Sequence, residues 1–468
     1  MKQRYFDNSL LKEWLANTRL QPPVGPTCHR DFAALAGRFA GEWRVICPEM
    51  RGRGDSAYDP QPQRYLPVTY AHDNHLPLAV RSGGHSLARH SVTEGGIVLD
   101  LRDMRALEID AQQRIASAET GLTAGEYTTA AGAHGLATGF GDTGSVGIGG
   151  ITLGGGIGYL VRKYGLTIDD LLAAEVVTAD GQVLQVDEGS HPDLFWAIRG
   201  GGGNFGVATR FRFRLHQLDQ VVGGMLLLPA TPDLIASFVA EAEAAPEELS
   251  TIANVMPAPP LPFVPAEHHG RLVIMATLVH AGAVEDGQRA VAPFRALAEP
   301  IADMVRPMPY PEIYPPEEGG FHPTAVSRTM LVDAVDRDAT AAIVEHLEAS
   351  TAPMRVAQLR VLGGAMARVP AEATAFAHRA SRLMVNVAAI YGRPEEAEDH
   401  EAWVDRFAAA LRNGDARAYV NFLGDEGQAR VREAYPGSTW ERLAAVKRRY
   451  DPTNLFHLNQ NIPPTTPG

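Results

Sequence analysis

The stretch Arg81-Ser-Gly-Gly-His-Ser86 directly follows the apolar run Leu76-Pro-Leu-Ala-Val80. A short aliphatic run that breaks into paired glycines predicts a strand followed by a tight turn. Because glycine has no Cβ and reaches positive φ without strain, such a turn can bring its backbone close to a bound group. Its N–H groups can then cradle a pyrophosphate, and His85 can act there as acid, base, ligand or covalent anchor.

Two more glycine-rich stretches follow. Residues 144–158 hold eight glycines in fifteen positions, which predicts irregular backbone pressed against something flat or anionic rather than a regular helix or strand. The apolar residues between these glycines argue against a flexible linker. Residues 200–206 contain the G-x-G-x-x-G spacing of dinucleotide folds. However, a predicted helix precedes them and a predicted strand follows, which is the reverse of the order a Rossmann site needs.

Length and composition limit the remaining choices. A chain of 468 residues exceeds the size at which one core keeps growing, so two domains are expected. The formal charge of −13 argues against a nucleic-acid partner. No apolar run is long enough to span a membrane and no signal peptide is recognisable, so we predict no membrane partner and a cytoplasmic location. Two cysteines, Cys28 and Cys47, exclude a thiolate metal site and leave one disulfide open, and we predict no metal.

These stretches together resemble the FAD-binding domain of the berberine-bridge-enzyme-like flavoprotein oxidases, within the vanillyl-alcohol-oxidase class. The resemblance covers about residues 74–464. Besides the histidine turn, the motifs that carry it are Val146-Gly-Ile-Gly-Gly150 with Leu153-Gly-Gly-Gly-Ile-Gly158, Tyr164-Gly-Leu-Thr-Ile-Asp169, Asp193-Leu-Phe-Trp-Ala-Ile-Arg-Gly-Gly-Gly-Gly-Asn-Phe-Gly206, Tyr450-Asp-Pro-Thr-Asn-Leu-Phe456 and Asn459-Gln-Asn-Ile-Pro-Pro464.

The resemblance implies an FAD-dependent oxidoreductase. We expect an oxidase that moves a hydride from an alcohol, sugar or amine carbon to FAD, with molecular oxygen as the final acceptor and H2O2 as product. It implies a covalent bond between His85 and FAD. Thr143 stands where many relatives have a second, cysteinyl attachment, which leaves a single histidyl bond. Val146 stands where a small gatekeeper is associated with oxygen access. The expected cofactor-binding residues are Arg81, Ser82, Gly83, Gly84, His85, Ser86, Thr143, Val146, Gly147, Gly149, Gly150, Gly154, Gly155, Gly156, Gly206, Val207, Asn459 and Asn461.

Two residues are expected to face the substrate. Tyr419 is the candidate base, because tyrosines serve this way in the resembled family, although a buried tyrosine with a structural hydrogen bond would look the same. Asn386 interrupts the apolar strand 383–390, which resembles the central strand over the flavin. Its side chain either points at the substrate or is a core amide whose hydrogen bonds are made within the protein. Tyr310 and Tyr314 are weaker pocket candidates.

The predicted fold is α+β, with a two-subdomain FAD-binding domain of the PCMH type and an antiparallel-sheet substrate domain that carries helices on one face. Helices are predicted over 232–244 and 338–350. The expected units are residues 1–73, an atypical N-terminal segment; 74–217, the FAD-binding domain; 218–415, the substrate domain; and 416–468, a return to the FAD domain.

The N-terminal segment leaves alternatives open. Residues 27–73 resemble the start of an α/β-hydrolase, and Arg89 replaces a glycine that usually follows the histidine turn, so a flavin-poor or inactive fusion is one alternative. A serine hydrolase is another, with Ser86 as nucleophile in Gly84-His-Ser-Leu-Ala88, where Ala88 replaces the last glycine of the usual elbow. A third is a non-enzymatic binder of small aromatic molecules. Substrate identity and oligomeric state are not specified by the sequence.

Overall fold

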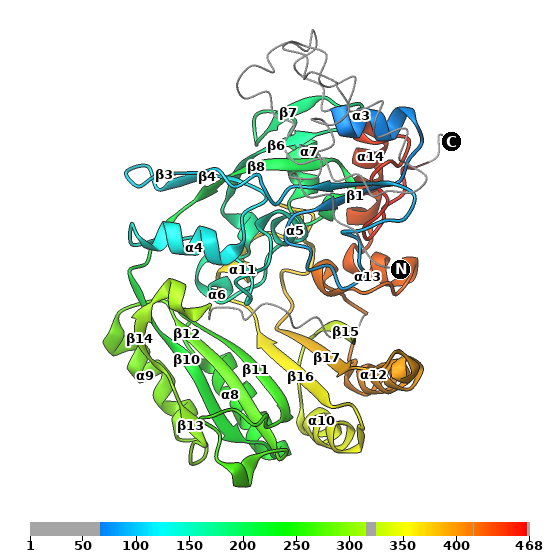
Figure 1. The fold of residues 1–468 in the computed structure, drawn as a ribbon. Coiled ribbons are helices and arrows are strands. Elements are labelled where there is room, and N and C mark those ends of the chain that lie inside the picture. Colours follow the sequence, from blue (N-terminus) through cyan, green and yellow to red (C-terminus); the bar gives the residue numbers. More distant parts are fainter. Residues whose placement is uncertain (1–65, 315–323, 415, 466–468) are drawn as a thin grey trace, which may run out of the picture.

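The computed structural model describes residues 66–314, 324–414 and 416–465, which form two bodies, each built on one large antiparallel sheet (Figure 1). The expectations for residues 1–65, among them most of the hydrolase-like segment and both cysteines, lie outside the described residues.

The first body contains a five-stranded sheet in the order β3-β4-β8-β6-β7, with every neighbouring pair antiparallel. A parallel pair, β1 and β2, and a two-residue pair, β5 and β9, complete its strands. The strands are β1 (Leu78–Arg81), β2 (Ile97–Asp100), β3 (Leu107–Asp110), β4 (Ile115–Glu119), β5 (Leu136–Ala137), β6 (Leu171–Val177), β7 (Val183–Val186), β8 (Val207–Arg214) and β9 (His216–Gln217). The helices are α3 (Leu66–Asp73), α4 (Ala124–Gly132), α5 (Ile148–Gly154), α6 (Val161–Tyr164) and α7 (Pro192–Ile198), with short 3-10 turns η1 (Thr167–Asp169) and η2 (Gly202–Asn204).

Helix α3 belongs to the core of this first body. Its Val68 and Ala71 are fully buried and pack in one apolar cluster with Leu78 of β1 and Phe456 near the C-terminus. The described end of the N-terminal segment is therefore integrated into the fold through apolar burial, the dominant favourable term in folding.

The second body is an eight-stranded antiparallel sheet in the order β13-β10-β12-β11-β16-β17-β15, with β14 also paired to β10. Its strands are β10 (Gln220–Pro229), β11 (Leu249–Pro257), β12 (Leu272–His280), β13 (Ala302–Asp303), β14 (Arg306–Pro309), β15 (Thr324–Val332), β16 (Met354–Val361) and β17 (Leu383–Tyr391). Its helices are α8 (Pro232–Ala244), α9 (Val284–Arg295), α10 (Arg337–Ala349) and α12 (Ala397–Leu411), with 3-10 turns η3 (Ala266–His268), η4 (Tyr310–Ile313) and η5 (Pro394–Glu396). Helix α11 (Ala365–Arg368) follows β16 and packs against α6 of the first body.

Strand alternation gives the large sheet two different faces. In β17, Leu383, Val385 and Val387 pack into the cluster that α8, α9, α10 and α12 cover. Successive strand residues point to opposite faces, so Met384 and Asn386 face the first body instead. The period of two therefore determines which residues of this sheet face the first body.

The chain then returns to the first body through η6 (Val420–Phe422), α13 (Gln428–Ala434) and α14 (Ser438–Tyr450), the orange and red elements of Figure 1. Lys447 of α14 is fully buried, and its ammonium donates to the Asn204 and Phe456 carbonyl oxygens and to the Asp451 carboxylate, each within 2.8 Å. Because every proton of this buried charge has an acceptor, the cluster fixes the C-terminal segment against the glycine-rich loop.

Most predicted elements are present and two expectations are wrong. The helices predicted over 232–244 and 338–350 are α8 and α10 within one residue, and residues 175–184 form the β6–β7 hairpin. Residues 148–154, however, form helix α5 despite their glycines, where irregular backbone was expected. β17 is not the central strand of its sheet but lies next to the edge strand β15.

Candidate functional site

A cavity of about 490 Å³ lies between the first body and the face of the large sheet that the helices leave uncovered. This volume is within the usual range for small-molecule and cofactor sites. Five regions of the chain far apart in sequence form its walls: residues 78–91, 141–157, 202–208, strands β16 and β17, and the returning segment 419–460. The cavity therefore depends on the association of the two bodies and the C-terminal segment.

The histidine turn packs backbone to backbone against the start of α5. A Cβ added to Gly83 would lie 2.2 Å from the Gly147 nitrogen, and one added to Gly147 would lie 2.1 Å from the Gly83 nitrogen. Gly84 has a φ of +79°, which favours glycine. Ser82 ties the turn to the first sheet, since its hydroxyl donates to the Thr120 carbonyl oxygen at 2.6 Å. The close backbone approach that the structure shows is to the start of the neighbouring helix α5, while the predicted approach to a bound group stays a prediction.

His85 stands at the tip of this turn and lines the cavity. Its ring is largely exposed, and Nε2 lies 2.8 Å from the Ser145 hydroxyl. A hydrogen bond on one ring nitrogen determines which role is left to the other, so Nδ1 is the nitrogen open for further bonding.

Ser86 also lines the cavity, but its surroundings differ from a nucleophile elbow. Its hydroxyl accepts from the His90 backbone N–H at 3.3 Å, and no helix begins within residues 82–100. A nucleophile elbow places its serine on a turn from strand directly to helix. The geometry gives no support to the serine-hydrolase alternative.

The glycines of α5 divide into two groups. Gly149 and Gly150 line the cavity, and a Cβ on Gly150 would have no atom of the described residues within 4 Å. The three glycines at the end of the helix do not line it, because they accommodate protein side chains. A Cβ would lie 1.9 Å from Asn421 Oδ1 at Gly154, 3.2 Å from Phe376 Cδ2 at Gly155 and 1.9 Å from Thr167 Oγ1 at Gly156.

Residues 202–208 and 456–460 form another part of the cavity wall. Gly206, with a φ of +156°, packs against β6, and Val207 lines the cavity beside it. Asn459 also lines the cavity. Its Nδ2 donates to the Phe456 carbonyl oxygen at 3.0 Å, while its buried Oδ1 has no partner among the described residues.

Arg81 and Asn461 lie behind the lining rather than in it. Arg81 Nε is 4.0 Å from an Asp100 carboxylate oxygen and makes no hydrogen bond within the described chain, and the Asn461 Oδ1 is likewise unpartnered there. Thr143 and Val146 do line the cavity, on the loop before α5.

The residues present fit a flavin dinucleotide. Buried polar atoms nearly always have hydrogen-bond partners, so the unpartnered Asn459 Oδ1 and the unpartnered His90 Nε2 in the cavity walls indicate a polar ligand there. Gly150 and Gly203 leave open space at the cavity, where any side chain would project into it. A cavity lined by glycine backbone and by unpartnered polar atoms suits a cofactor that is part aromatic and part anionic.

Tyr419 lies on the returning segment and is fully buried, yet its hydroxyl reaches the cavity wall. The oxygen accepts from the Gly156 N–H at 2.9 Å, the Ile157 N–H at 3.3 Å and the Asn421 side-chain amide at 2.9 Å. Burial raises the pKa of Tyr419, although the three donors act in the opposite direction. Tyr310 and Tyr314 do not line the cavity, and the Tyr314 hydroxyl donates to the Gly141 carbonyl oxygen at 2.9 Å.

Asn386 lies on the cavity-facing side of β17 within a row of polar side chains that crosses four strands. Its Oδ1 accepts from the Thr329 hydroxyl at 2.7 Å. Register places Gln358 of β16 beside it and Asn254 of β11 beyond, and Gln358 Nε2 donates to Asn254 Oδ1 at 2.9 Å. Arg360, two residues along β16, donates to Gln358 Oε1 and to the Asp142 carboxylate.

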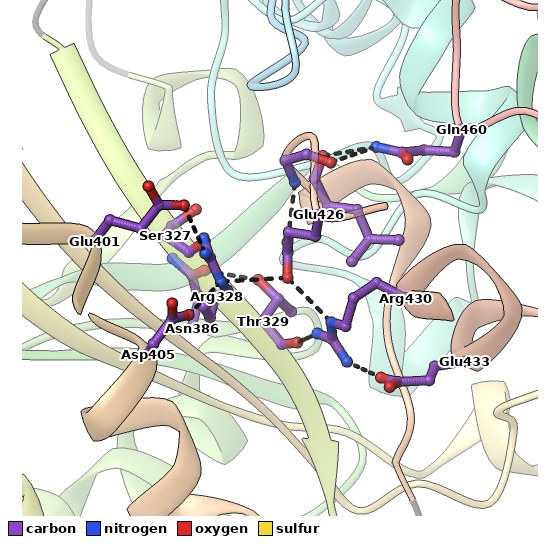
Figure 2. Close-up of polar contacts among 12 residues, drawn as sticks. Ser327, Arg328, Thr329, Asn386, Glu401, Asp405, Glu426, Arg430, Glu433 and Gln460 are labelled. Atoms are coloured by element: carbon purple, nitrogen blue, oxygen red, sulfur yellow. Dashed lines mark hydrogen bonds and ion pairs between the residues drawn. The ribbon is translucent and has the colours of Figure 1, made fainter. Parts of the chain in front are cut away.

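A charged cluster supports this row from the side of the C-terminal segment (Figure 2). Glu426, whose side chain is 5% exposed, lies between Arg328 of β15 and Arg430 of α13 at 3.5 and 3.0 Å. Arg430 also donates to the Thr329 carbonyl oxygen at 2.7 Å, and Thr329 holds Asn386. The cluster connects the large sheet to the segment that carries Tyr419.

Sequence reasoning missed several lining residues, among them Asp142, Gln358, Arg360, Asn421 and Gln460. One pattern could have identified two of them. In β16, Gln358 and Arg360 alternate with Ala357 and Leu359, and polar side chains at a period of two on a buried strand predict a polar face. Asp142 lies in a loop, where no periodicity exists to mark it.

The described part of the chain shows neither a group of side chains suited to hold a metal ion nor a helix long and apolar enough to cross a membrane.

Known proteins match the chain over most of its length. A family model described as an FAD binding domain matches residues 67–187, and another, described as berberine and berberine like, matches residues 418–463. The (R)-6-hydroxynicotine oxidase of Paenarthrobacter nicotinovorans is 31% identical over 85% of this chain and 88% of its own length. The uncharacterized FAD-linked oxidoreductase YvdP of Bacillus subtilis is 30% identical over 85% of this chain and 89% of its own.

Solved structures agree with these matches. A crystal structure of 6-hydroxy-D-nicotine oxidase from Arthrobacter nicotinovorans superposes with a TM-score of 0.75 at 29% identity, covering 85% of this chain and 89% of that one. Xylooligosaccharide oxidase from Myceliophthora thermophila, solved with xylobiose, gives a TM-score of 0.73 at 24% identity over 86% and 89% of the two chains, which bears on the fold alone. The predicted α+β fold class and the family resemblance are confirmed.

Proposed function

The chain belongs to the berberine-bridge-enzyme-like family of FAD-linked oxidoreductases, and from this premise we propose that it is an oxidase with FAD held through one covalent bond to His85. The observation that carries the proposal is the cavity itself, which is lined by the histidine turn, by Gly149 and Gly150 of α5 and by Asn459 with its unpartnered amide oxygen. When bound there, FAD would accept two electrons from a substrate carbon and hand them to O2, which would leave as H2O2.

The covalent bond is proposed at the Nδ1 atom of His85. With the proton on Nε2 donated to the Ser145 hydroxyl, Nδ1 carries the lone pair and is the nucleophilic nitrogen. Thr143 lines the same cavity and carries no thiol, so a second, cysteinyl attachment at that position is chemically excluded.

Of the predicted cofactor-binding residues, we assign direct contact to those that line the cavity: Ser82, Gly83, Gly84, His85, Ser86, Thr143, Val146, Gly147, Gly149, Gly150, Gly206, Val207 and Asn459. Arg81 and Asn461 would act on the cofactor only from behind this lining. Gly154, Gly155 and Gly156 are assigned to close packing against Asn421, Phe376 and Thr167.

Substrate oxidation also requires removal of a proton from the reacting hydroxyl or amine. Tyr419 is the proposed acceptor. The three N–H donors on its oxygen favour the phenolate, while burial opposes it, so the group would work best at high pH. Asn386 is proposed to hydrogen-bond the substrate rather than to transfer protons, since an amide does not titrate.

Oxygen would reach the cavity beside Val146. This side chain lines the cavity next to the contact between Gly83 and Gly147, and its small size leaves room for a diatomic molecule.

We also propose residues 74–217, 218–415 and 416–468 as the functional units, with the described helix α3 joining the first of them through the core it shares with β1 and β2.

The test is the state of the purified protein. We expect a yellow preparation whose colour stays in the precipitate after acid denaturation, because a covalent bond survives unfolding. In the His85→Ala variant the colour should pass to the supernatant. A Ser145→Ala variant is the matched control, since it removes the hydrogen bond on Nε2 and keeps the nucleophile. A colourless protein that takes up no FAD would refute the proposal and favour the flavin-poor alternative.

A further inference from the structure

The sheet wall of the cavity presents hydrogen-bond donors and almost no free acceptors. Asn386 has its Oδ1 engaged by the Thr329 hydroxyl, as Figure 2 shows, and no described residue accepts from its NH2 group. Gln358 has its Oε1 engaged by two nitrogens of Arg360. Both N–H bonds of Asn386, the one N–H of Gln358 that does not donate to Asn254, and the second lone pair of Asn386 Oδ1 remain for a ligand, so free donors outnumber free acceptors.

The charges of the lining side chains are also balanced within the protein. Among the described residues that line the cavity, Asp142 is the sole carboxylate, and Arg360 donates to it. Arg360 is nearly fully buried, and its guanidinium also lies 5.0 Å from the centre of the Phe422 ring. The pair is thus neutralised internally, and no lining carboxylate is left over for a cationic ligand.

A protonated amine suits such a wall poorly. An ammonium group has donors only and no lone pair, so it cannot accept from Asn386 or Gln358. Burying it without a carboxylate partner is strongly unfavourable. A hydroxyl group accepts from these amides and carries no charge.

We infer that the substrate is a neutral hydroxylated molecule, oxidised at a CH–OH carbon, and not a cationic amine. The inference rests on the proposed function. In the overall reaction one alcohol and one O2 give one carbonyl compound and one H2O2. The C–H and O–H bonds of the alcohol break, a C=O bond forms, and O2 takes up the two electrons and two protons. The hydroxynicotine oxidase named above acts on a nicotine derivative, so this wall predicts a different preference from that relative.

The experiment uses matched pairs that differ by one hydroxyl or ammonium group: benzyl alcohol and benzylamine, cinnamyl alcohol and cinnamylamine, D-glucose and D-glucosamine. Each is mixed anaerobically with the purified yellow protein at pH 7, and bleaching of the visible flavin absorbance is followed. Peroxide release is measured separately in air. We expect the neutral member to bleach the flavin at least about tenfold faster in every pair that reacts.

Asn386→Asp sharpens the test because it replaces the donating amide by a carboxylate of the same shape, which Thr329 can still hold. We expect it to move the preference toward the ammonium member by about tenfold or more. Asn413→Asp adds the same charge beyond the end of α12, outside the cavity lining, and should leave the preference unchanged. If the Asn386→Asp variant does not retain its flavin, the preference is measured in Arg360→Gln instead. This change removes the partner of Asp142 and so leaves a lining carboxylate unpaired.

The outcomes separate the two proposals. A colourless protein refutes the proposed function. A yellow protein bleached faster by the ammonium members, or by no member of any pair, overturns the substrate inference while the flavoprotein assignment stands. An equal shift in Asn386→Asp and Asn413→Asp would also overturn it, because a general change in protein charge would then explain the preference.

Discussion

The two walls of the cavity are built from different parts of the polypeptide. The wall of the first body is largely backbone, where Gly83 and Gly147 touch through their main chains and Gly150 is open to the space. The wall of the large sheet is made of side chains, with Gln358, Arg360 and Asn386 projecting from two neighbouring strands. A backbone wall can hold any ligand that fits its N–H groups and shape, whereas a side-chain wall can be changed one residue at a time.

This difference assigns separate tasks to the two walls. Where the backbone wall is packed, it tolerates almost no side chain, because an added Cβ meets other backbone within about 2 Å. It is therefore suited to one invariant partner, the cofactor. The sheet wall accepts many side chains without loss of strand pairing, so it is suited to determine the substrate.

The largest effect is expected from Gly147→Ala. The new Cβ would meet the Gly83 nitrogen at 2.1 Å, and neither backbone can move without displacing β1 or α5. We expect a loss of at least about 3 kcal/mol of stability and of FAD retention, measured by thermal unfolding and by flavin absorbance per protein.

Gly150→Ala is its matched control, three residues along the same helix. No described atom lies within 4 Å of the added Cβ, so the fold should be kept or slightly stabilised, by up to about 1 kcal/mol. If the flavin lies against Gly150 as proposed, this variant alone should fold normally and bind FAD poorly. Equal unfolding of both variants would contradict the division between packed and open glycines.

Tyr419→Phe comes next, because the Tyr419 hydroxyl accepts from the Gly156 and Ile157 N–H groups just after α5 and Tyr419 lines the cavity. If the hydroxyl accepts the substrate proton, turnover should fall by about 10²–10⁴-fold with the flavin still bound. Burial raises the pKa of Tyr419, and the base must be deprotonated, so native turnover should increase with pH through the neutral and alkaline range. The measurement is peroxide release against pH in both proteins.

A structural role for the same hydroxyl predicts another pattern. Removing the oxygen leaves the Gly156 and Ile157 N–H groups without their acceptor. The variant would then unfold at lower temperature and lose FAD, with the pH profile of the remaining activity unchanged. Phe422→Tyr is the control, because it adds a hydroxyl on the same segment without affecting those donors.

The charged cluster of Figure 2 tests whether the sheet wall depends on the returning segment that carries Tyr419. Glu426→Gln removes the buried charge between Arg328 and Arg430 and leaves both guanidinium groups with less compensation. We expect destabilisation of about 3 kcal/mol, measured by denaturant unfolding. Asp405→Asn removes a carboxylate that pairs with the same Arg328 but is 54% exposed, and should cost no more than about 1 kcal/mol. Similar losses of stability in Glu426→Gln and Asp405→Asn would show that the buried Glu426 carboxylate does not hold the returning segment to the large sheet.

The sequence predicted the backbone wall well and the side-chain wall poorly, for a physical reason. Glycine clusters such as 83–84 and 147–150 have few explanations other than close approach, so they identify a site without knowledge of the fold. Gln358 and Arg360 are ordinary polar residues whose meaning depends on strand register and on which face the helices cover. Asp142 becomes a lining residue only when β16 brings Arg360 to it. A glycine cluster does not always indicate a cofactor site, since Gly154 to Gly156 accommodate protein side chains.

The smallest effect concerns a departure from the glycine rule. Arg89, where a glycine was expected from the resemblance, has a φ of +60°, a conformation that strains a residue with a Cβ by about 1 kcal/mol. Arg89→Gly should relieve this strain, partly offset by the greater flexibility of the unfolded chain, and raise the unfolding temperature by a few degrees at most.

The informative comparison for Arg89 is Arg114→Gly. Arg114 has a φ of +55° in the β3–β4 turn, away from the cavity lining, so it should give a similar thermal gain and leave FAD incorporation unchanged. If Arg89 strains the turn that carries His85, then Arg89→Gly alone should also increase the fraction of protein with covalent FAD, measured as acid-stable flavin per chain. Equal flavin content in both variants would mean that the backbone wall holds its shape regardless of the loop that follows it.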